Sequence, residues 1–167
     1  FTTQQQIDSF QVNYPGCTEI AGNLEIAGTG INNLNGLNVL TSIAWNLDIH
    51  DNHALTSLSG LDNLTTIGGG LYITNDIALT SLAGLDNVTY ISSISLHANP
   101  VLTSVAELDG LTSVRFYISI YDNPSLVSLT GLNDITSIGD YLSIGWNPAI
   151  TSMSGLERLS SIVGVLN

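Results

Sequence analysis

One phrase recurs along most of this chain and limits what the chain can fold into. The sequence Leu-Thr-Ser-Leu-Ser-Gly-Leu-Asp-Asn-Leu-Thr-Thr-Ile, at residues 55–67, returns with small changes toward the C-terminus. Repeats of this length are typical of solenoids, in which each unit buries its apolar side against the next. Six repeating units, called coils here, follow at spacings of 23 or 24 residues and begin near Ala21, Ala44, Gly68, Ser92, Arg115 and Gly139.

Seven apolar positions recur in every coil. All six coils fill all seven positions with an aliphatic residue or methionine. Because surface positions do not keep such regularity, we interpret the seven columns as the core. In the second coil the seven positions are Leu47, Ile49, Leu55, Leu58, Leu61, Leu64 and Ile67.

A short element in each coil alternates apolar and polar residues, as in Leu47-Asp48-Ile49. This period is that of a strand. Equivalent strands one coil apart stack as a parallel sheet, at ~4.8 Å per coil. The rest of each coil is rich in Thr, Ser, Gly and Asn, so we expect extended arcs and turns there rather than helices.

The N-terminal segment differs from the coils. Thr3 and Gln6 have the spacing of a capping box, and apolar residues follow at helical intervals. We predict a short helix over about residues 3–12 that covers the apolar end of the first coil. The chain then divides into a helical cap at 1–20 and an array at 21–167, which ends with the start of a seventh coil.

Two patterns carry a family resemblance. Residues 43–55 read Ile-x-x-x-Leu-x-Ile-x-x-Asn-x-x-Leu, which resembles a leucine-rich repeat. Residues 17–26 and 64–73 resemble more closely the L domain of insulin- and epidermal-growth-factor-type receptors, in the version found in secreted bacterial repeat proteins. The resemblance extends from residue 17 to the end, and it implies a right-handed parallel β-helix whose role is recognition.

Composition excludes several partners. The chain has 14 carboxylates against two Arg and no Lys, for a net charge of −12. Nucleic acid and anionic lipid both need clustered cations, so we predict binding to neither. No apolar run approaches the ~20 residues of a membrane span, so we also predict no membrane insertion. An acidic surface rich in Ser, Thr and Asn suits a secreted or cell-surface protein.

Candidate chemistry is sparse. Cys17 is the only cysteine, and it has no neighbouring motif that would make it a nucleophile. His50-Asp51-Asn52-His53 is the one cluster with metal-ligand residue types, but two candidate ligands are fewer than a closed site needs. No Ser-His-Asp constellation, phosphate loop or dinucleotide fingerprint is present. We therefore predict a protein that is not an enzyme and has no metal or cofactor.

An Asn column follows the strands at one fixed position. An inward Asn can both donate to and accept from the turns of neighbouring coils, so the column predicts a hydrogen-bonded ladder. Asp76 occupies the same slot, and an ionised Asp can only accept. We expect that coil to use Asn75 instead, or to expose Asp76. The column is Asn52, Asn99, Asn123 and Asn147.

A glycine column marks a turn, which we interpret as a position that needs positive φ. Glu107 interrupts the column and Gly110 appears three residues later, so the fourth coil should turn differently. The column is Gly36, Gly60, Gly84, Gly131 and Gly155.

Thr-Ser or Thr-Thr pairs form two further columns, for example at residues 56–57 and 65–66. A regular Thr array can order water, which would suit an ice-binding protein. The pairs lie between apolar positions three apart, however, so they do not alternate as a flat Thr-x-Thr face requires. Hydroxyl-to-backbone bonds at bends are the more common use of such residues.

The outward strand positions vary from coil to coil, whereas the inward ones do not. Tyr and Trp are frequent anchors of recognition surfaces, although an exposed sheet also accepts aromatics for packing alone. We predict a recognition or adhesion module that binds a protein or glycan here. A structural or adhesive rod that self-associates end to end through an open C-terminal coil is the alternative, and ice binding is third. The candidate ligand-binding residues are Trp45, Asp48, His50, Tyr72, His97, Tyr117, Tyr121, Tyr141 and Trp146.

Overall fold

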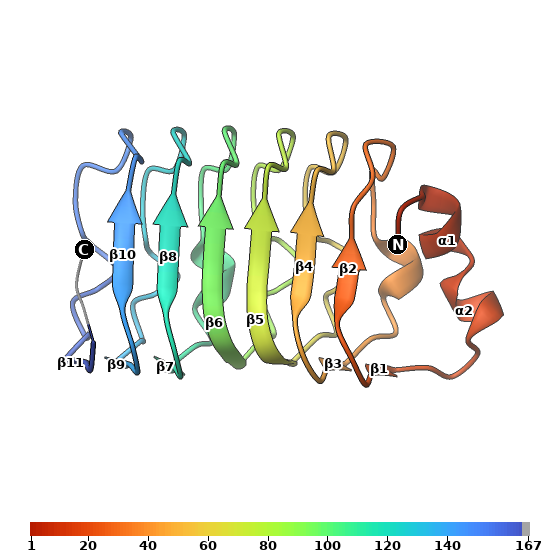
Figure 1. The fold of residues 1–167 in the computed structure, drawn as a ribbon, viewed down its shortest axis with the longest axis horizontal. Coiled ribbons are helices and arrows are strands. Elements are labelled where there is room, and N and C mark those ends of the chain that lie inside the picture. Colours follow the sequence, from red (N-terminus) through yellow and green to blue (C-terminus); the bar gives the residue numbers. More distant parts are fainter. Residues whose placement is uncertain (165–167) are drawn as a thin grey trace.

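A computed structural model describes residues 1–164 and confirms the predicted parallel β-solenoid. Its main sheet lies along one side of the coils, with every strand parallel to its neighbours (Figure 1). The part of this sheet that carries the Leu-x-Ile elements comprises β2 (Leu24–Ile26), β4 (Leu47–His50), β5 (Thr66–Thr74), β6 (Tyr90–His97), β8 (Ile118–Tyr121) and β10 (Leu142–Gly145).

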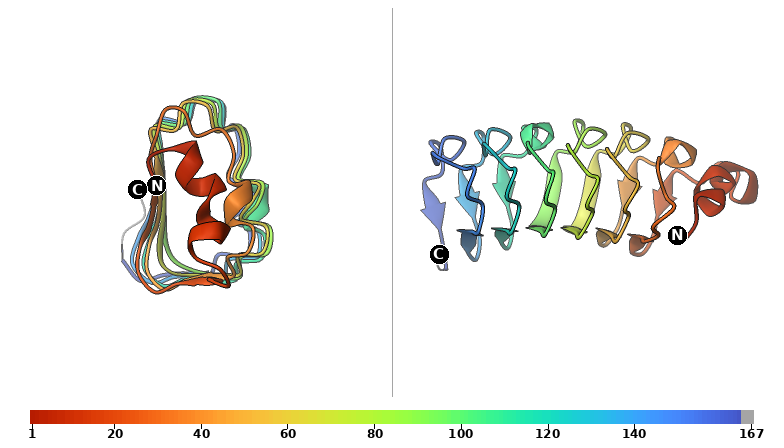
Figure 2. Two further views of the ribbon diagram at one scale, coloured as in Figure 1. Left: turned by 90° about the vertical axis from the view of Figure 1, so that its right-hand side faces the viewer. Right: turned by 90° about the horizontal axis from the view of Figure 1, so that it is seen from above.

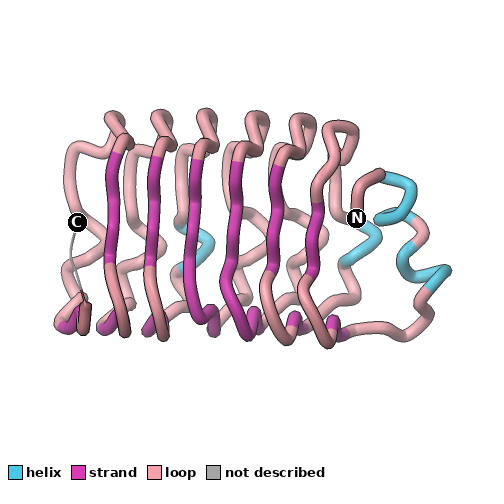
Figure 3. Tube along the Cα trace, viewed as in Figure 1, coloured by secondary structure: helices cyan, strands magenta, loops and turns pink. Residues whose placement is uncertain are grey.

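A second row of short strands forms the adjoining side of the coils (Figure 3). Only β5 and β6 run continuously through the corner between the two sides, and their pairing shifts register between Ile67 and Gly70. A triple glycine at residues 68–70 lies at this shift. The short strands are β1 (Glu19–Ile20), β3 (Ser42–Ile43), β7 (Ser113–Val114), β9 (Ser137–Ile138) and β11 (Ser161–Ile162).

Turns and bends close the third side, seen end-on in Figure 2. The described coils contain no α-helix after the cap, as their composition predicts. Two single-turn 3-10 helices occur there, η1 (Asn35–Leu37) in the first coil and η2 (Ala106–Leu108) in the fourth. The fourth coil therefore turns differently from its two neighbours at Glu107, as predicted, but the first coil forms the same kind of turn with Gly36 in place.

The N-terminal cap is helical, as predicted, but consists of two short helices, α1 (Gln4–Asp8) and α2 (Phe10–Asn13). Thr3 and Gln6 form the capping box at the start of α1. The break falls at Ser9, whose hydroxyl donates to the Gln5 carbonyl. Bonding of this kind competes with the continuing helix.

The seven apolar columns form the core. In the first five coils every member is buried. In the sixth coil only Leu142 is buried, while Met153 is 58% exposed, because no described coil packs on its far side. The predicted start of a seventh coil falls mostly on residues 165–167, which lie outside the described part of the chain.

The Asn ladder is present, and Asp76 belongs to it. The prediction that Asp76 would be exposed or replaced by Asn75 is wrong: Asp76 is fully buried and Asn75 is exposed. One Asp76 carboxylate oxygen, Oδ1, accepts from the Asn52 backbone N–H at 2.8 Å and from the Asn52 side-chain amide at 3.0 Å. Asp76 therefore fits the position that Asn side chains occupy in the other coils, because its Oδ1 accepts the same kind of hydrogen bonds.

The glycine column has two physical causes, not one. Gly60, Gly84 and Gly155 have φ of 106–111°, as predicted. The prediction fails for Gly36 and Gly131, which lack positive φ. A Cβ at Gly36 would fall 1.9 Å from the Ile7 carbonyl oxygen, and one at Gly131 would fall 1.8 Å from that of Val105. Close backbone approach excludes a side chain at these two positions.

The hydroxyl columns serve backbone groups. Thr hydroxyls donate to the carbonyl of the equivalent Thr one coil earlier, as from Thr80 to Thr56 and from Thr103 to Thr80, both at 3.1 Å. Ser hydroxyls accept locally instead, as Ser104 does from the Ala106 N–H at 3.0 Å. The protons of these Thr hydroxyls are therefore used within the protein.

Truncation of a central core residue tests the column assignment. Leu85→Ala should lower the free energy of unfolding by ~2–5 kcal/mol, because it removes buried methyl groups and leaves a cavity. Val127→Ala is the matched control, since the Val127 side chain is 58% exposed. Chemical denaturation measures both. Equal losses in the two variants would contradict a core role for Leu85.

Candidate ligand-binding face

The outward side chains of the main sheet form the predicted binding surface, called the sheet face here. Strand pairing places them in three rows that cross the strands. No Arg or Lys occurs in these rows. The middle row is Glu25, Asp48, Tyr72, Ser95, Ser119 and Ser143, and the upper row is His50, Thr74, His97, Tyr121 and Gly145. The lower row is Asn46, Gly70, Ser93, Tyr117 and Tyr141, in which Gly70 pairs with Ser93 and the other three follow when the register is extended by one residue.

Three tyrosines make contact near the start of the strands. The Tyr117 and Tyr141 rings are parallel, with 4.8 Å between centroids and 1° between planes. Partial burial raises the pKa of the Tyr117 hydroxyl, and the neighbouring Tyr72 hydroxyl raises it further. The Tyr72 ring lies over Gly70, where an added Cβ would meet ring atoms at 2.4 Å. Glycine thus lets this cluster lie flat against the sheet.

A second ring pair occupies the upper row. His97 and Tyr121 stack with 5.7 Å between centroids. His97 Nε2 and Ser119 Oγ lie 3.0 Å apart, and the Ser143 hydroxyl donates to the Tyr121 hydroxyl at 3.2 Å. Neighbouring Ser hydroxyls therefore orient both rings.

His50 lies at the centre of an acidic group. Its Nδ1 is 3.0 Å from Asp51 Oδ2, and its Nε2 is 3.2 Å from Glu25 Oε1. The hydrogen bond to Asp51 raises the pKa of His50 most, and Glu25 and Asp48 raise it further against the effect of burial. The pKa of Asp51 is lowered, chiefly by its bond to His50. Partial burial raises the pKa of Asp48.

This group does not form a metal centre by geometry. Across residues 1–164, no three His, Cys, Asp or Glu side chains are arranged to hold an ion. His53 is exposed in the following turn, where its charge also lowers the pKa of Asp51 slightly. Cys17 is a free thiol, partly packed against the first coil.

The two tryptophans lie at the margins. Trp45 is 63% exposed and Trp146 is 80% exposed. Trp146 also has φ of 57°, in the left-handed region, where a bulky side chain is rare. It shares this conformation with the equivalent residue of four earlier coils, Asp51, Asn75, Ala98 and Asp122.

The nine predicted residues thus form two ring clusters, one His-carboxylate group and two separate tryptophans. Sequence reasoning omitted Glu25, which is the direct neighbour of Asp48 in the middle row. The signal was available, because Glu25 precedes Asp48 by 23 residues, one coil length. Sequence reasoning likewise did not identify Ser119 and Ser143, whose hydroxyls lie within hydrogen-bond distance of His97 and Tyr121.

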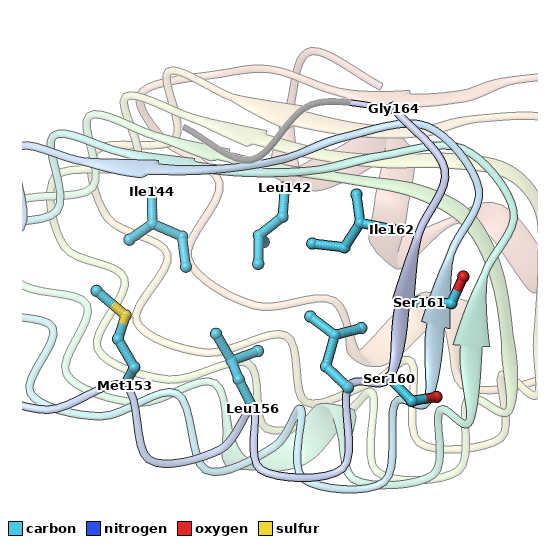
Figure 4. Close-up of a pocket in the computed structure, with 9 residues that line it drawn as sticks. Leu142, Ile144, Met153, Leu156, Ser160, Ser161, Ile162 and Gly164 are labelled. Atoms are coloured by element: carbon cyan, nitrogen blue, oxygen red, sulfur yellow. The ribbon is translucent and has the colours of Figure 1, made fainter.

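An apolar hollow lies away from the sheet face, against the inner side of the sixth coil (Figure 4). It measures about 720 Å³, and Leu142, Ile144 and Met153 are among its lining residues. These side chains belong to the core columns. The hollow is therefore a part of the solenoid interior that residues 1–164 leave uncovered.

Comparison with known families identifies the class of protein. The family model of the receptor L domain matches residues 16–130, and the chain belongs to this family. Comparisons with curated proteins and with solved structures gave no match. The family is typical of extracellular ligand-binding modules, which are not catalytic. Within residues 1–164, no helix is long and apolar enough to cross a membrane.

The titration of His50 tests the geometry of its group. Asp51→Asn should lower the pKa of His50, because the hydrogen bond to Asp51 is the main cause of its elevation. A raised folded pKa stabilises the fold below the unfolded pKa of about 6.5, and this contribution is lost as pH rises through the folded value. Imidazole NMR shifts across pH measure the change. Asp109→Asn, at an exposed carboxylate elsewhere, should leave the titration unchanged, and equal curves in both variants would contradict the contact.

Proposed function

We propose that this protein is a secreted or cell-surface recognition module that binds a protein or glycan ligand on the sheet face. The observation that carries the proposal is the contrast within each strand. Inward positions are uniformly aliphatic, whereas outward positions differ between coils and include four Tyr and two His. Such rings offer a large contact area together with polar atoms.

Membership of the receptor L domain family supports a role in binding. We infer that the protein is not an enzyme. Ser119 and His97 are the pair that most resembles a catalytic nucleophile and its base. However, no carboxylate among the described residues hydrogen-bonds to the other nitrogen of His97. A Ser-His pair without an orienting acid lacks one part of the usual triad.

Trp146 supports a binding role independently. Its left-handed backbone is unfavourable for a bulky residue, and its ring is largely exposed to water. The turn itself belongs to every one of these coils, but it does not require a Trp, since Asp, Asn and Ala occupy the equivalent positions. Residues held in such conformations concentrate at functional sites, where the unfavourable geometry is retained for another purpose.

A ligand screen tests the proposal directly. The folded chain is applied to a glycan array and to a panel of extracellular protein domains, and binding to each hit is then measured for two variants. Tyr141→Ala should weaken binding by ~1–3 kcal/mol, as expected for an aromatic anchor. Tyr90→Ala is the control, because Tyr90 is an exposed tyrosine at the start of β6, outside the three rows. Equal affinity of Tyr141→Ala and the unmodified chain would contradict the assignment, as would loss of binding on changing Thr80 or Thr103 instead.

Trp146→Asn separates binding from folding. Asn tolerates the left-handed conformation and already occupies the equivalent position at residue 75. The variant should therefore be more stable by about 1 kcal/mol, yet bind the same hit more weakly. Thermal unfolding and titration with the hit measure the two effects. Unchanged binding would exclude Trp146 from the site.

A structural or adhesive rod is the second candidate. The apolar hollow at the sixth coil favours it, because a second copy docked there would cover Met153 and its neighbours. The helical cap covers the other end of the coils, so copies would meet through their sixth coils. Light scattering across concentration should then show a dimer that Met153→Asp abolishes. A monomer at every concentration would contradict this role.

A further inference from the structure

Each Asn side chain of the ladder supplies both a hydrogen-bond acceptor and a donor to the coil before it. Each Asn oxygen accepts a backbone N–H from the ladder position one coil earlier, as Asn99 does from Asp76 at 3.1 Å. Each Asn amide also donates to the carbonyl of the last apolar strand residue one coil earlier. These acceptors are Ile26 for Asn52, Ile73 for Asn99, Leu96 for Asn123 and Ile120 for Asn147, at 2.8–3.0 Å.

Asp76 can fulfil only half of this role when it is ionised. Its Oδ1 accepts from Asn52, as the Asn oxygens do from their neighbours. Its Oδ2 takes the place of the donating amide nitrogen, and this atom is buried without a hydrogen-bond partner. The equivalent acceptor is the carbonyl of Ile49, the last apolar residue of the β4 strand. A carboxylate oxygen has no proton to give to that carbonyl.

The surroundings of Asp76 only partly offset a negative charge. The two hydrogen bonds from Asn52 to Oδ1 favour the ionised form, but burial outweighs them. On the β4 side, His50 favours the ionised form but Asp51 opposes it. On the β6 side, the adjoining residues are Ala98 and Asn99, which carry no charge. No ion pair to Asp76 occurs within the described chain. Burial is the largest influence, and it raises the pKa of Asp76 to about 6.

We propose that Asp76 is a proton-binding site within the ladder, where a proton on Oδ2 donates to the Ile49 carbonyl and completes the column as an amide would. Protonation then tightens the junction between the second and third coils, near the end of β4 that carries His50. Ionisation at higher pH removes this bond and leaves a buried charge. This junction therefore becomes more stable in mild acid, whereas the junctions between coils that Asn forms do not change with pH.

The sign of the effect follows from linkage. The folded pKa of about 6 lies above the ordinary value of 3.8. The stabilisation is therefore complete below about pH 3.8 and is lost as pH rises through about 6. Asp76→Asn carries a permanent donor and does not titrate. Its advantage over the unmodified chain should be small in acid and large at neutral pH.

Thermal unfolding of Asp76→Asn tests the proposal. The gain in Tm over the unmodified chain should be larger at pH 7.5 than at pH 4 by about 5–10 °C. Asp109→Asn is the control for loss of one charge, because Asp109 is exposed and has no ladder contact. Its effect on Tm should be small at both values of pH. Equal gains for Asp76→Asn at both values would overturn the proposal.

A second measurement uses the unmodified chain and does not depend on the variant. Carboxyl-carbon NMR of aspartate-labelled protein reports the titration of Asp76, with the Asp76→Asn spectrum as assignment if that variant folds. We expect a buried carboxyl that titrates near pH 6. If instead every aspartate titrates near the ordinary value, Oδ2 carries no proton in the folded state and the proposal is wrong.

Discussion

A coil of this protein cannot bury its own apolar residues, and this constraint governs the structure. Seven inward side chains per coil find their contacts only on the coils before and after. Each coil must therefore repeat the backbone path of its neighbours closely. Close stacking also brings turn backbones into the interior, where their N–H and carbonyl groups need partners. The Asn ladder and the Thr hydroxyls supply those partners at fixed positions.

Once stacking determines the inward residues, the outward strand residues are free to differ. The sheet face shows the result, with acidic and imidazole groups toward the first coils and paired rings toward the later ones. Serine and glycine between the rings leave space for them to lie close to the backbone. The regular stacking of the coils thus fixes the spacing of outward side chains that differ from coil to coil.

Repetition made most of the fold predictable. The columns alone identified the buried residues of the first five coils, and alternation located the main strands. The cap helix followed from its capping box, although the break at Ser9 did not, because a local hydroxyl bond decides it. Met153 matched its column but not its predicted burial, since a column position is buried only when a coil lies on each side.

The remaining errors arose where one residue type serves two purposes. Residues 36 and 131 are glycine because the backbone of another segment lies too close for a side chain, and not because φ is positive. The sequence alone does not distinguish these two reasons for a glycine. Asp76 was judged by the chemistry of an ionised group, whereas burial favours its neutral form. At the sheet face, the residue types were evident from the sequence, but partners such as Glu25 for His50 became clear only with the register between coils.

The coil-to-coil hydrogen bonds also determine how the array responds to mechanical force. Phe1 and the last described coil lie at opposite ends of the rod, and the inter-coil bonds run along the axis that joins them (Figures 1 and 2). Tension applied along this axis pulls each inter-coil contact open in turn and does not shear all of them together. The chain should therefore extend in steps of one coil, at low force, and act as a compliant tether when anchored at one end and pulled at the other.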